Sequence, residues 1–199
     1  MAESFNFDSL DIVLPKRQAQ SHKGSYGRVA VIAGSKGMGG AGILASEASL
    51  FCGSGLVSLY THSSNAQASL QRNPEIMTIG VDSHENISGD FDVILIGPGF
   101  SDNKWSKELS ECISLDAPYG LIIDAGALTY TKKIQSQNNK NLILTPHPGE
   151  AAALLGVSAD EIQLNREDNA IDIAKKYNAS AVVLKGHNTL VYIKSEDKT

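Results

Sequence analysis

Short apolar runs rich in β-branched residues recur along the chain and are separated by polar or helical segments. Six such runs are present: Val29–Ile32, Leu56–Leu59, Val93–Ile96, Leu121–Ile123, Leu142–Leu144 and Ala181–Leu184. A short continuous apolar run is typical of a strand that is buried on both faces, as strands of parallel sheets are. The pattern therefore predicts a mostly parallel central sheet.

Helical patterns lie between several of these runs. They cover residues 41–52, 105–113, 150–155 and 160–177. Pro148 and Glu150 mark one helix start, because a proline in the first turn loses no hydrogen bond and a carboxylate there meets the positive end of the helix dipole. Strands that alternate with helices predict an α/β fold whose sheet carries helices on both faces.

The last apolar segment reads as two strands around a tight turn at His187-Asn188, followed by the polar residues 195–199. No further helical pattern follows to cover this hairpin. Because an α/β sheet is normally covered on both faces, we expect residues 1–199 to form a single domain that lacks its C-terminal part.

Composition and charge narrow the function. The 199 residues are 42% hydrophobic and 20% charged, with a net charge of −5, which is typical of one ordinary folded domain. The scattered Lys and Arg residues give no basic face for nucleic acid. The chain also shows no signal peptide and no apolar stretch of the roughly 20 residues that a membrane helix needs. We expect a cytoplasmic protein that binds small molecules, without nucleic acid or membrane.

The cysteine and histidine residues do not predict a metal site. Cys52 and Cys112 lie far apart, with no CxxC pair and no histidine at ligand spacing. His22 and His62 stand in polar stretches and are interpreted as surface residues. The residues alone therefore indicate no metal centre and no disulfide framework, which agrees with a reducing compartment.

Candidate chemistry lies in the segments that directly follow the apolar runs, because ligands of open α/β sheets bind beyond the carboxyl ends of the strands. These segments are Ala33–Gly42, Gly97–Phe100, Asp124–Leu128, Thr145–Glu150 and Lys185–Thr189. The first contains Gly37-x-Gly39-x-x-Gly42, which matches the dinucleotide fingerprint. That fingerprint needs an acidic residue at the end of the second strand, and Tyr60-Thr61-His62 supplies none. We interpret the match as incidental, although glycines still allow a ligand to approach the backbone.

Each candidate residue has a structural interpretation beside the functional one. Gly97-Pro98-Gly99 can be a tight turn, and Asp124 can cap a helix or contact a ligand. His147 can order its own turn or present both ring nitrogens to a cleft. Lys185 beside Gly186 can be a solvated hairpin corner or a phosphate contact.

Taken together and in order, six motifs closely resemble the ADP- or ATP-dependent NAD(P)HX dehydratase family, a carbohydrate-kinase-like domain. The motifs are Lys23-Gly24-Ser25-Tyr26-Gly27, the Ala33-Gly34-Ser35 loop ending in Gly40-Ala41, Gly97-Pro98-Gly99, Asp124-Ala125-Gly126-Ala127-Leu128, Thr145-Pro146-His147-Pro148-Gly149-Glu150 and Lys185-Gly-x-x-Thr189. The resemblance implies a ribokinase-like fold. It also implies dehydration of the S-form of hydrated NADH and NADPH (NADHX and NADPHX) with ADP or ATP as co-substrate and Mg²⁺.

The resemblance assigns roles by position. Ala41, Gly99, Asp124 and His147 would contact the hydrated dinucleotide, whereas Lys185, Gly186, His187, Asn188 and Thr189 would line the adenine-nucleotide phosphates. It further implies a homo-oligomer, a tetramer, and an NAD(P)HX epimerase as functional partner. ADP cannot be distinguished from ATP by these residues.

Three departures from the family pattern stand out. Gly39 replaces a proline that is common before Gly-Ala, and Gly126 replaces the second Asp of Asp-Ala-Asp-Ala-Leu. Relatives also continue into a Gly-Gly-Thr-Gly-Asp stretch, whose Asp is the expected base and lies beyond Thr199 here. We therefore expect the 199-residue chain to be nearly inactive. The alternatives are a kinase of the same fold that acts on a vitamin precursor or sugar, and a non-catalytic dinucleotide-binding chain.

Overall fold

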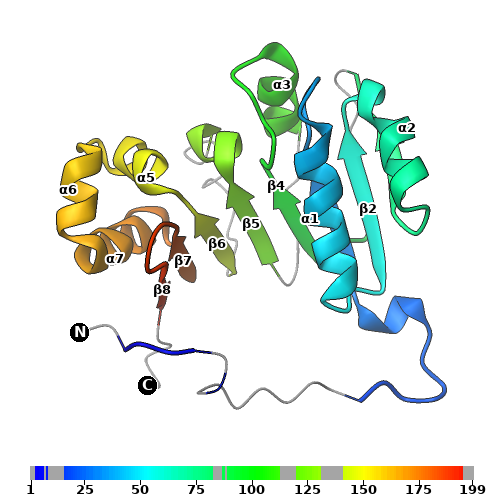
Figure 1. The fold of residues 1–199 in the computed structure, drawn as a ribbon, viewed down its shortest axis with the longest axis horizontal. Coiled ribbons are helices and arrows are strands. Elements are labelled where there is room, and N and C mark those ends of the chain that lie inside the picture. Colours follow the sequence, from blue (N-terminus) through cyan, green and yellow to red (C-terminus); the bar gives the residue numbers. More distant parts are fainter. Residues whose placement is uncertain are drawn as a thin grey trace.

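The computed structural model describes residues 3–6, 8, 16–82, 87, 89–112, 120–130 and 141–194. Within them, eight strands form one sheet in the order β3-β2-β1-β4-β5-β6-β7-β8 (Figure 1). The strands are β1 (Arg28–Ile32), β2 (Leu56–Thr61), β3 (Met77–Gly80), β4 (Val93–Ile96), β5 (Gly120–Asp124), β6 (Leu142–Thr145), β7 (Ala181–Leu184) and β8 (Leu190–Ile193). All neighbours pair in parallel except β7 and β8, which are antiparallel. The predicted mostly parallel sheet and its final hairpin are confirmed.

Helical segments connect the strands. They are η2 (Lys23–Tyr26), α1 (Gly39–Phe51), α2 (Ser63–Arg72), α3 (Lys104–Cys112), η3 (Ala125–Tyr130), α5 (Pro148–Leu155), α6 (Ala159–Leu164) and α7 (Arg166–Tyr177). The prediction of one helix over 160–177 is wrong, because the chain breaks at Asn165, which ends α6 and precedes α7. Residue 113, the expected end of α3, lies outside the described residues.

Helix α2 and strand β3 were not predicted. Helix α2 is too polar to show an apolar stripe, but His62 marks its start by accepting a hydrogen bond from the Ser64 N–H. Strand β3 has only four residues and sits at the sheet edge beside β2. Both elements form by packing against their neighbours, β3 against β2 and α2 against α1 and β3, rather than because of a strong propensity of their own residues.

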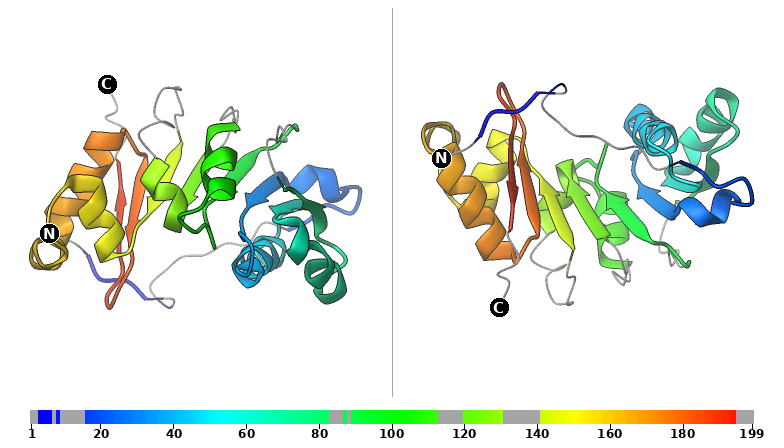
Figure 2. Two further views of the ribbon diagram at one scale, coloured as in Figure 1. Left: turned by 90° about the horizontal axis from the view of Figure 1, so that it is seen from above. Right: turned by 90° about the horizontal axis from the view of Figure 1, so that it is seen from below.

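The connections wind in two directions. From β1 the chain steps outward to β2 and β3, whereas from β4 it steps the other way through β5, β6 and β7. Because parallel connections are right-handed, α1 and α2 cover one face, and α3 and α5 to α7 cover the other (Figure 2). The direction reverses between β1 and β4, and that switch point is where α/β folds bind ligands.

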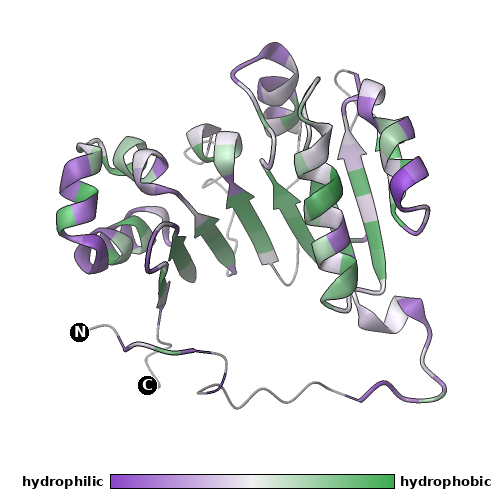
Figure 3. Cartoon of the chain, in the orientation of Figure 1, coloured by the Kyte–Doolittle hydropathy of each residue, from purple (hydrophilic) through white to green (hydrophobic). Residues whose placement is uncertain are grey.

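The core consists of two apolar clusters, one on each face of the sheet. The smaller one joins Val31 and Leu59 to Ile43 of α1, and the larger one joins Ile96 and Ile123 to the other helices. Figure 3 shows the apolar strands of the sheet and the mixed polarity of the helices. Burial on both faces explains why the strands read as unbroken apolar runs.

The outer end of the sheet is covered on one face by α7, which packs against both β7 and β8. The hairpin therefore has a covering helix on one face, supplied by a segment that precedes it in the chain. On the other face, Val191 is 44% exposed and Ile193 is 70% exposed. Among the described residues, no helix is long and apolar enough to cross a bilayer.

Candidate active site at the carboxyl edge of the sheet

The loops after β1 and β4 meet at the switch point and hold each other through the backbone. The Gly34 N–H donates to the Pro98 carbonyl at 2.8 Å, and the Ser35 N–H donates to the Gly99 carbonyl at 3.0 Å. The Ser35 hydroxyl also donates to the Gly99 carbonyl at 2.8 Å. We call these two loops, residues 33–41 and 97–100, the glycine crevice.

The glycine crevice leaves no room for side chains at its centre. Gly99 has φ +70°, and a Cβ atom there would lie 2.8 Å from the Met38 carbonyl oxygen and 3.0 Å from the Ala41 Cβ. Gly97 has φ +117°, and its Cβ would overlap the Asp124 carbonyl oxygen and lie 2.7 Å from the Ala127 Cβ. Sequence reasoning predicted Gly99 and Ala41 as site residues, and the structure brings them into contact distance.

Two residues that sequence reasoning missed, one at the end of β2 and one on α2, secure the crevice. The Asn65 side-chain amide donates to the carbonyls of Gly34 and Ser35 at 2.8 and 3.2 Å, and the Thr61 hydroxyl donates to the Gly34 carbonyl at 2.9 Å. Thr61 ends β2, where a dinucleotide fingerprint would need a carboxylate. The Gly-rich loop is therefore held as a rigid turn. Only the polar pattern after β2 could have indicated these contacts.

Three adjacent strands place a polar or charged side chain on the same edge. Asp124 at the end of β5 pairs in register with Thr145 of β6, whose hydroxyl donates to Asp124 Oδ1 at 2.7 Å. The Lys185 N–H, directly after β7, donates to the Pro146 carbonyl at 2.9 Å. The Lys185 ammonium pairs with Asp124, with 2.6 Å between Nζ and Oδ1. Asp124 is therefore an ion-pair partner of Lys185.

His147 caps helix α5. Its Nδ1 accepts hydrogen bonds from the N–H groups of Gly149 and Glu150 at 3.0 and 3.3 Å, and its own N–H donates to Glu150 Oε2 at 2.7 Å. Of the two interpretations of His147, the one in which it orders its own turn is confirmed, and the one in which both ring nitrogens face a cleft is wrong, because the cap uses Nδ1. A neutral His147 carries its proton on Nε2, which lies 3.4 Å from Glu150 Oε1.

Glu150, which sequence reasoning did not select, joins these groups. One of its carboxylate oxygens lies 3.8 Å from Lys185 Nζ, and the side chain is only 18% exposed. We call Asp124, Thr145, Glu150 and Lys185 the charged corner. The Thr-Pro-His-Pro-Gly-Glu motif, with its acid in the first helical turn, was the available signal for Glu150.

The segment Lys185–Thr189 is the loop of the final hairpin. Residues 186–189 are exposed, and Asn188 adopts a left-handed conformation with φ +56°. The Thr189 hydroxyl donates to the Gly186 carbonyl at 3.1 Å. The loop lies on the same edge as the charged corner because it follows the parallel strand β7.

The Lys23 segment, by contrast, lies at the opposite edge. Helix η2 precedes β1, and the Tyr26 carbonyl accepts a hydrogen bond from the Gly55 N–H at the start of β2. Its motif therefore does not join the carboxyl-edge site within one chain. His62 is also not a plain surface residue, because its ring packs against Trp105 at 6.0 Å between centroids.

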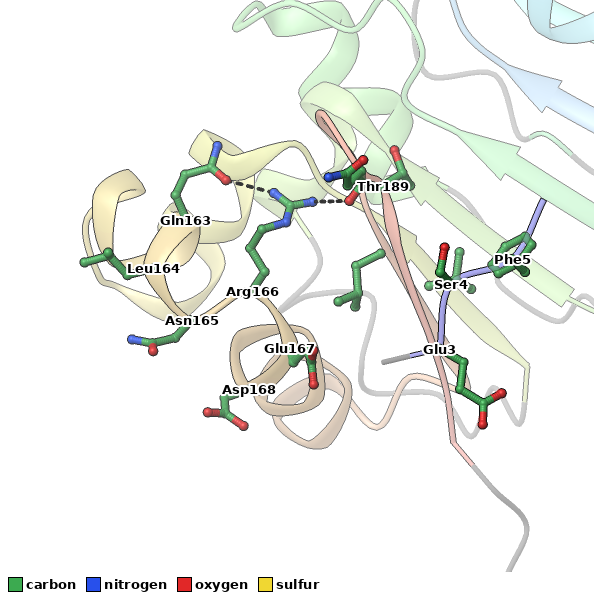
Figure 4. Close-up of a pocket in the computed structure, with 13 residues that line it drawn as sticks. Glu3, Ser4, Phe5, Gln163, Leu164, Asn165, Arg166, Glu167, Asp168 and Thr189 are labelled. Atoms are coloured by element: carbon green, nitrogen blue, oxygen red, sulfur yellow. Dashed lines mark hydrogen bonds between the residues drawn. The ribbon is translucent and has the colours of Figure 1, made fainter. Parts of the chain in front are cut away.

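Two pockets adjoin the carboxyl-edge loops. One of about 400 Å³ runs along α5 and includes His147 and Glu150, and one of about 870 Å³ borders the final hairpin (Figure 4). Neither pocket includes Ala41 or Gly99. The predicted site residues therefore share one edge of the sheet, but these pockets do not join them in one cleft.

The described residues contain no group of three or more His, Cys, Asp and Glu side chains arranged to hold a metal ion. The carboxylates of Asp124 and Glu150 both lie near the Lys185 ammonium. Such a corner is suited to an ion that arrives with phosphates, since Mg²⁺ is commonly bound through one or two carboxylates plus substrate oxygens.

Comparison with known proteins gives consistent matches. Residues 29–198 match the NAD(P)H-hydrate dehydratase family. The chain is 38% identical over 188 residues to the bifunctional NAD(P)H-hydrate repair enzyme Nnr of Coxiella burnetii. It is 36% identical over 192 residues to the ADP-dependent (S)-NAD(P)H-hydrate dehydratase of Staphylococcus aureus.

Solved structures agree in fold. The ADP/ATP-dependent NAD(P)H-hydrate dehydratase of Bacillus subtilis, co-crystallised with ATP/Mg²⁺, superimposes with a TM-score of 0.78 at 31% identity over 90% of this chain. A ribokinase-like superfamily protein of Enterococcus faecalis gives 0.77 at 28% identity over 89% of this chain. The predicted ribokinase-like fold is confirmed.

The matches differ in how much of each relative they cover. The match to the Coxiella protein covers 92% of this chain but only 38% of that protein. The match to the Staphylococcus protein covers 94% of this chain and 68% of that protein. It covers 65% of the Bacillus chain and 64% of the Enterococcus chain.

Proposed function

The chain belongs to the NAD(P)H-hydrate dehydratase family, and from this premise we propose that it takes part in ADP- or ATP-dependent dehydration of (S)-hydrated NADH and NADPH. The observation that carries the proposal is the placement of a glycine crevice and a charged corner on one edge of one sheet. The crevice suits close backbone approach by a dinucleotide, and the corner with its following loop suits phosphates.

The spacing of the two parts fits two ligands side by side. Strands β4 and β7 are separated by β5 and β6, which is three strand spacings or about 14 Å. Gly99 and Ala41 would lie against the hydrated dinucleotide, and Lys185–Thr189 against the phosphates of ADP or ATP. Asp124 lies between them and would orient the substrate side.

The reaction explains why a nucleotide is needed. Hydroxide is a poor leaving group, so transfer of a phosphoryl group to the ring hydroxyl makes its elimination easier, with phosphate as the group that leaves. Catalysis of phosphoryl transfer consists mainly of positioning and charge stabilisation. Lys185 supplies positive charge, and His147, whose Nε2 lies beside Glu150, would contact the hydrated dinucleotide through its exposed ring. Mg²⁺ bound with the nucleotide would neutralise phosphate charge, and Asp124 or Glu150 could hold it.

The test is calorimetric binding of ADP, ATP and chemically hydrated NADH, followed by recovery of NADH absorbance when both ligands are present. We expect both ligand classes to bind independently. His147→Ala should weaken hydrated-dinucleotide binding, with Lys107→Ala on α3 as a surface control. Absence of binding by both ADP and ATP would contradict the proposal.

The kinase alternative is tested in the same assay. Phosphorylation of a sugar or vitamin precursor with no recovery of NADH absorbance would favour it. The sequence of residues 1–199 contains no Gly-Thr-Gly-Asp stretch, and a positioned base typically contributes about 10²–10⁴-fold to rate. Turnover by the 199-residue chain comparable to that of a longer relative would show that residues 1–199 carry the required groups.

We further propose a cytoplasmic homo-oligomer, a tetramer, that works with an NAD(P)HX epimerase. The naming of the Coxiella relative as a bifunctional repair enzyme supports a link between two repair activities. Light scattering at several protein concentrations tests the assembly, and a concentration-independent monomer would contradict it.

A further inference from the structure

Arg166 reaches from the first residue of α7 to the backbone of the final hairpin. Its Nη2 donates to the Leu184 carbonyl at 2.9 Å and lies 3.4 Å from the carbonyls of Lys185 and Asn188. Figure 4 shows the side chain extended from α7 toward this loop. One guanidinium thus gathers three carbonyl groups at the base and within the loop Lys185–Thr189.

The position of this arginine is unfavourable for its own helix. A positive charge at a helix N-terminus opposes the helix dipole, which favours acids such as Glu167 and Asp168 in the same turn. The backbone carbonyls of the hairpin, which accept hydrogen bonds from the guanidinium, offset this unfavourable interaction with the helix dipole. Arg166 is half-buried, and Gln163 Oε1 accepts a hydrogen bond from Nη1 at 2.9 Å, so the guanidinium is held from both sides.

Gly186 allows the loop to approach the guanidinium. Its φ is +138°, and a Cβ atom at this position would lie 3.3 Å from Arg166 Nη1. The glycine after Lys185 therefore has a structural reason, the contact with Arg166, in addition to any contact with a ligand. Sequence reasoning had no signal for this contact, because the two residues are twenty positions apart.

The contacts to the Lys185 and Asn188 carbonyls determine where the next N–H group points in each case, that of Gly186 and that of Thr189. In a planar trans peptide the C=O and the following N–H point in opposite directions. When the Lys185 carbonyl faces Arg166, the Gly186 N–H must face away from α7. The N–H groups of Gly186, His187 and Asn188 make no hydrogen bond to a described residue. Successive N–H groups of this kind form an anion-binding concavity.

We propose that Arg166 is a positioning residue, which holds the carbonyls of the loop Lys185–Thr189 so that its N–H groups face the phosphates of the adenine nucleotide. Arg166 acts through the backbone and does not touch the phosphate. The inference deepens the proposed function and rests on it, since it requires nucleotide binding at this loop.

The test compares Arg166→Ala and Arg166→Lys with Arg72→Ala. Arg72 also makes a side-chain contact, with Glu47 at 2.9 Å, but stands on α2 at the far end of the sheet. We expect Arg166→Ala to weaken ADP and ATP binding about 10-fold or more by calorimetry, while binding of hydrated NADH is unchanged. Arg72→Ala should leave both unchanged.

Arg166→Lys separates geometry from charge. A lysine keeps the positive charge but lacks the planar fork that serves several acceptors at once. It should therefore remain clearly weaker than the wild type for ADP. Full rescue by lysine would overturn the proposal, because charge alone would then explain the effect. Equal loss of ADP and hydrated-NADH binding in Arg166→Ala would also overturn it, since that result indicates general destabilisation.

Hydrogen exchange of the segment 185–189 gives a second readout. In wild-type protein ADP should slow exchange of this segment, and in Arg166→Ala that slowing should be smaller, whereas exchange in α1 should not change. If Arg166→Ala does not fold, Gln163→Ala removes only the outer support and should weaken ADP binding in the same direction, by less. Wild-type protein without ADP or ATP binding would refute the proposed function, whereas wild-type affinity in Arg166→Ala refutes the role of Arg166.

Discussion

The glycine crevice and the charged corner share one edge of the sheet but are built from different interactions. The crevice is held by backbone hydrogen bonds and by glycines such as Gly97 and Gly99 at positions with no space for a side chain. The corner is held by the side chains of Asp124, Thr145 and Lys185. The first should therefore respond to changes in volume, and the second to changes in charge and salt.

The largest effect is expected for Gly97→Ala. The new methyl group would overlap the Asp124 carbonyl and lie 2.7 Å from the Ala127 Cβ, and φ +117° is unfavourable for alanine. Because the clash involves backbone atoms, we expect a loss of about 3 kcal/mol or more in the free energy of unfolding. Urea denaturation measures it.

Gly37→Ala is the matched control. Gly37 has φ +83°, but a Cβ atom there would meet nothing within 4 Å. The variant should lose only about 1–2 kcal/mol in the free energy of unfolding, which is the cost of holding an alanine in the left-handed backbone conformation. Equal losses in the two variants would show that crowding does not define the crevice.

Gly126→Asp should have the next largest effect. It introduces an acid on the loop after β5, but a Cβ at Gly126 would lie 2.6 Å from the Phe100 carbonyl and 2.8 Å from the Phe100 Cβ. We expect a loss of about 1–3 kcal/mol, as for other overpacked sites. Thermal unfolding followed by circular dichroism would test this, and an unchanged Tm would show that the β4 and β5 loops can separate.

The charged corner should respond to charge instead. Lys185→Met should weaken ADP binding about 10-fold, since the phosphates lose a cation, a change of about 1.4 kcal/mol. Without Mg²⁺, Asp124→Asn should not weaken ADP binding, because it releases the Lys185 ammonium from the ion pair, but it should weaken hydrated-NADH binding.

Salt sharpens this distinction. The effect of Lys185→Met on ADP binding should be smaller in about 0.5 M salt than in about 0.05 M salt. The Debye length is about threefold shorter at the higher concentration, so a surface charge is screened more strongly there. The loss in Gly97→Ala should stay the same. A salt-independent difference at Lys185 would place that side chain outside the nucleotide site.

The smallest effect is expected for Tyr177→Phe, beneath α5. The Tyr177 hydroxyl donates to the Leu154 carbonyl at 3.0 Å, and its removal should cost about 1 kcal/mol. Burial raises the pKa of Tyr177 above its ordinary value. Its contribution to stability is therefore full below about pH 10 and is lost as the pH rises through the folded-state pKa. Denaturation at pH 7 and at alkaline pH should show the difference between wild type and variant narrowing.

The strands and the site edge were predictable because both depend on local patterns. Unbroken apolar runs such as Val93–Ile96 report burial on both faces, and parallel strands bring the residues that follow them to one edge. Asp124, His147 and Lys185 could thus be placed together from the sequence.

The remainder depends on contacts between distant segments. The polar helix α2 contributes Asn65 to the crevice, and Arg166 meets the hairpin only after α7 has packed on β7. The cap at His147 was weighed as an alternative, but only atomic positions show that Nδ1 is used for it. These details come from tertiary geometry that no single-segment pattern contains.

The mutual bonding of the loops after β1 and β4 has a consequence for the order of folding. The Gly34 N–H and its Pro98 acceptor are separated by more than sixty residues, and the Gly97 N–H donates to Ile32 across a similar span. Non-local pairing of this kind forms slowly, because a long loop must close before the contact is gained. Hydrated-dinucleotide binding should consequently recover late during refolding from urea, with the kinetics of central-sheet assembly rather than those of helix formation.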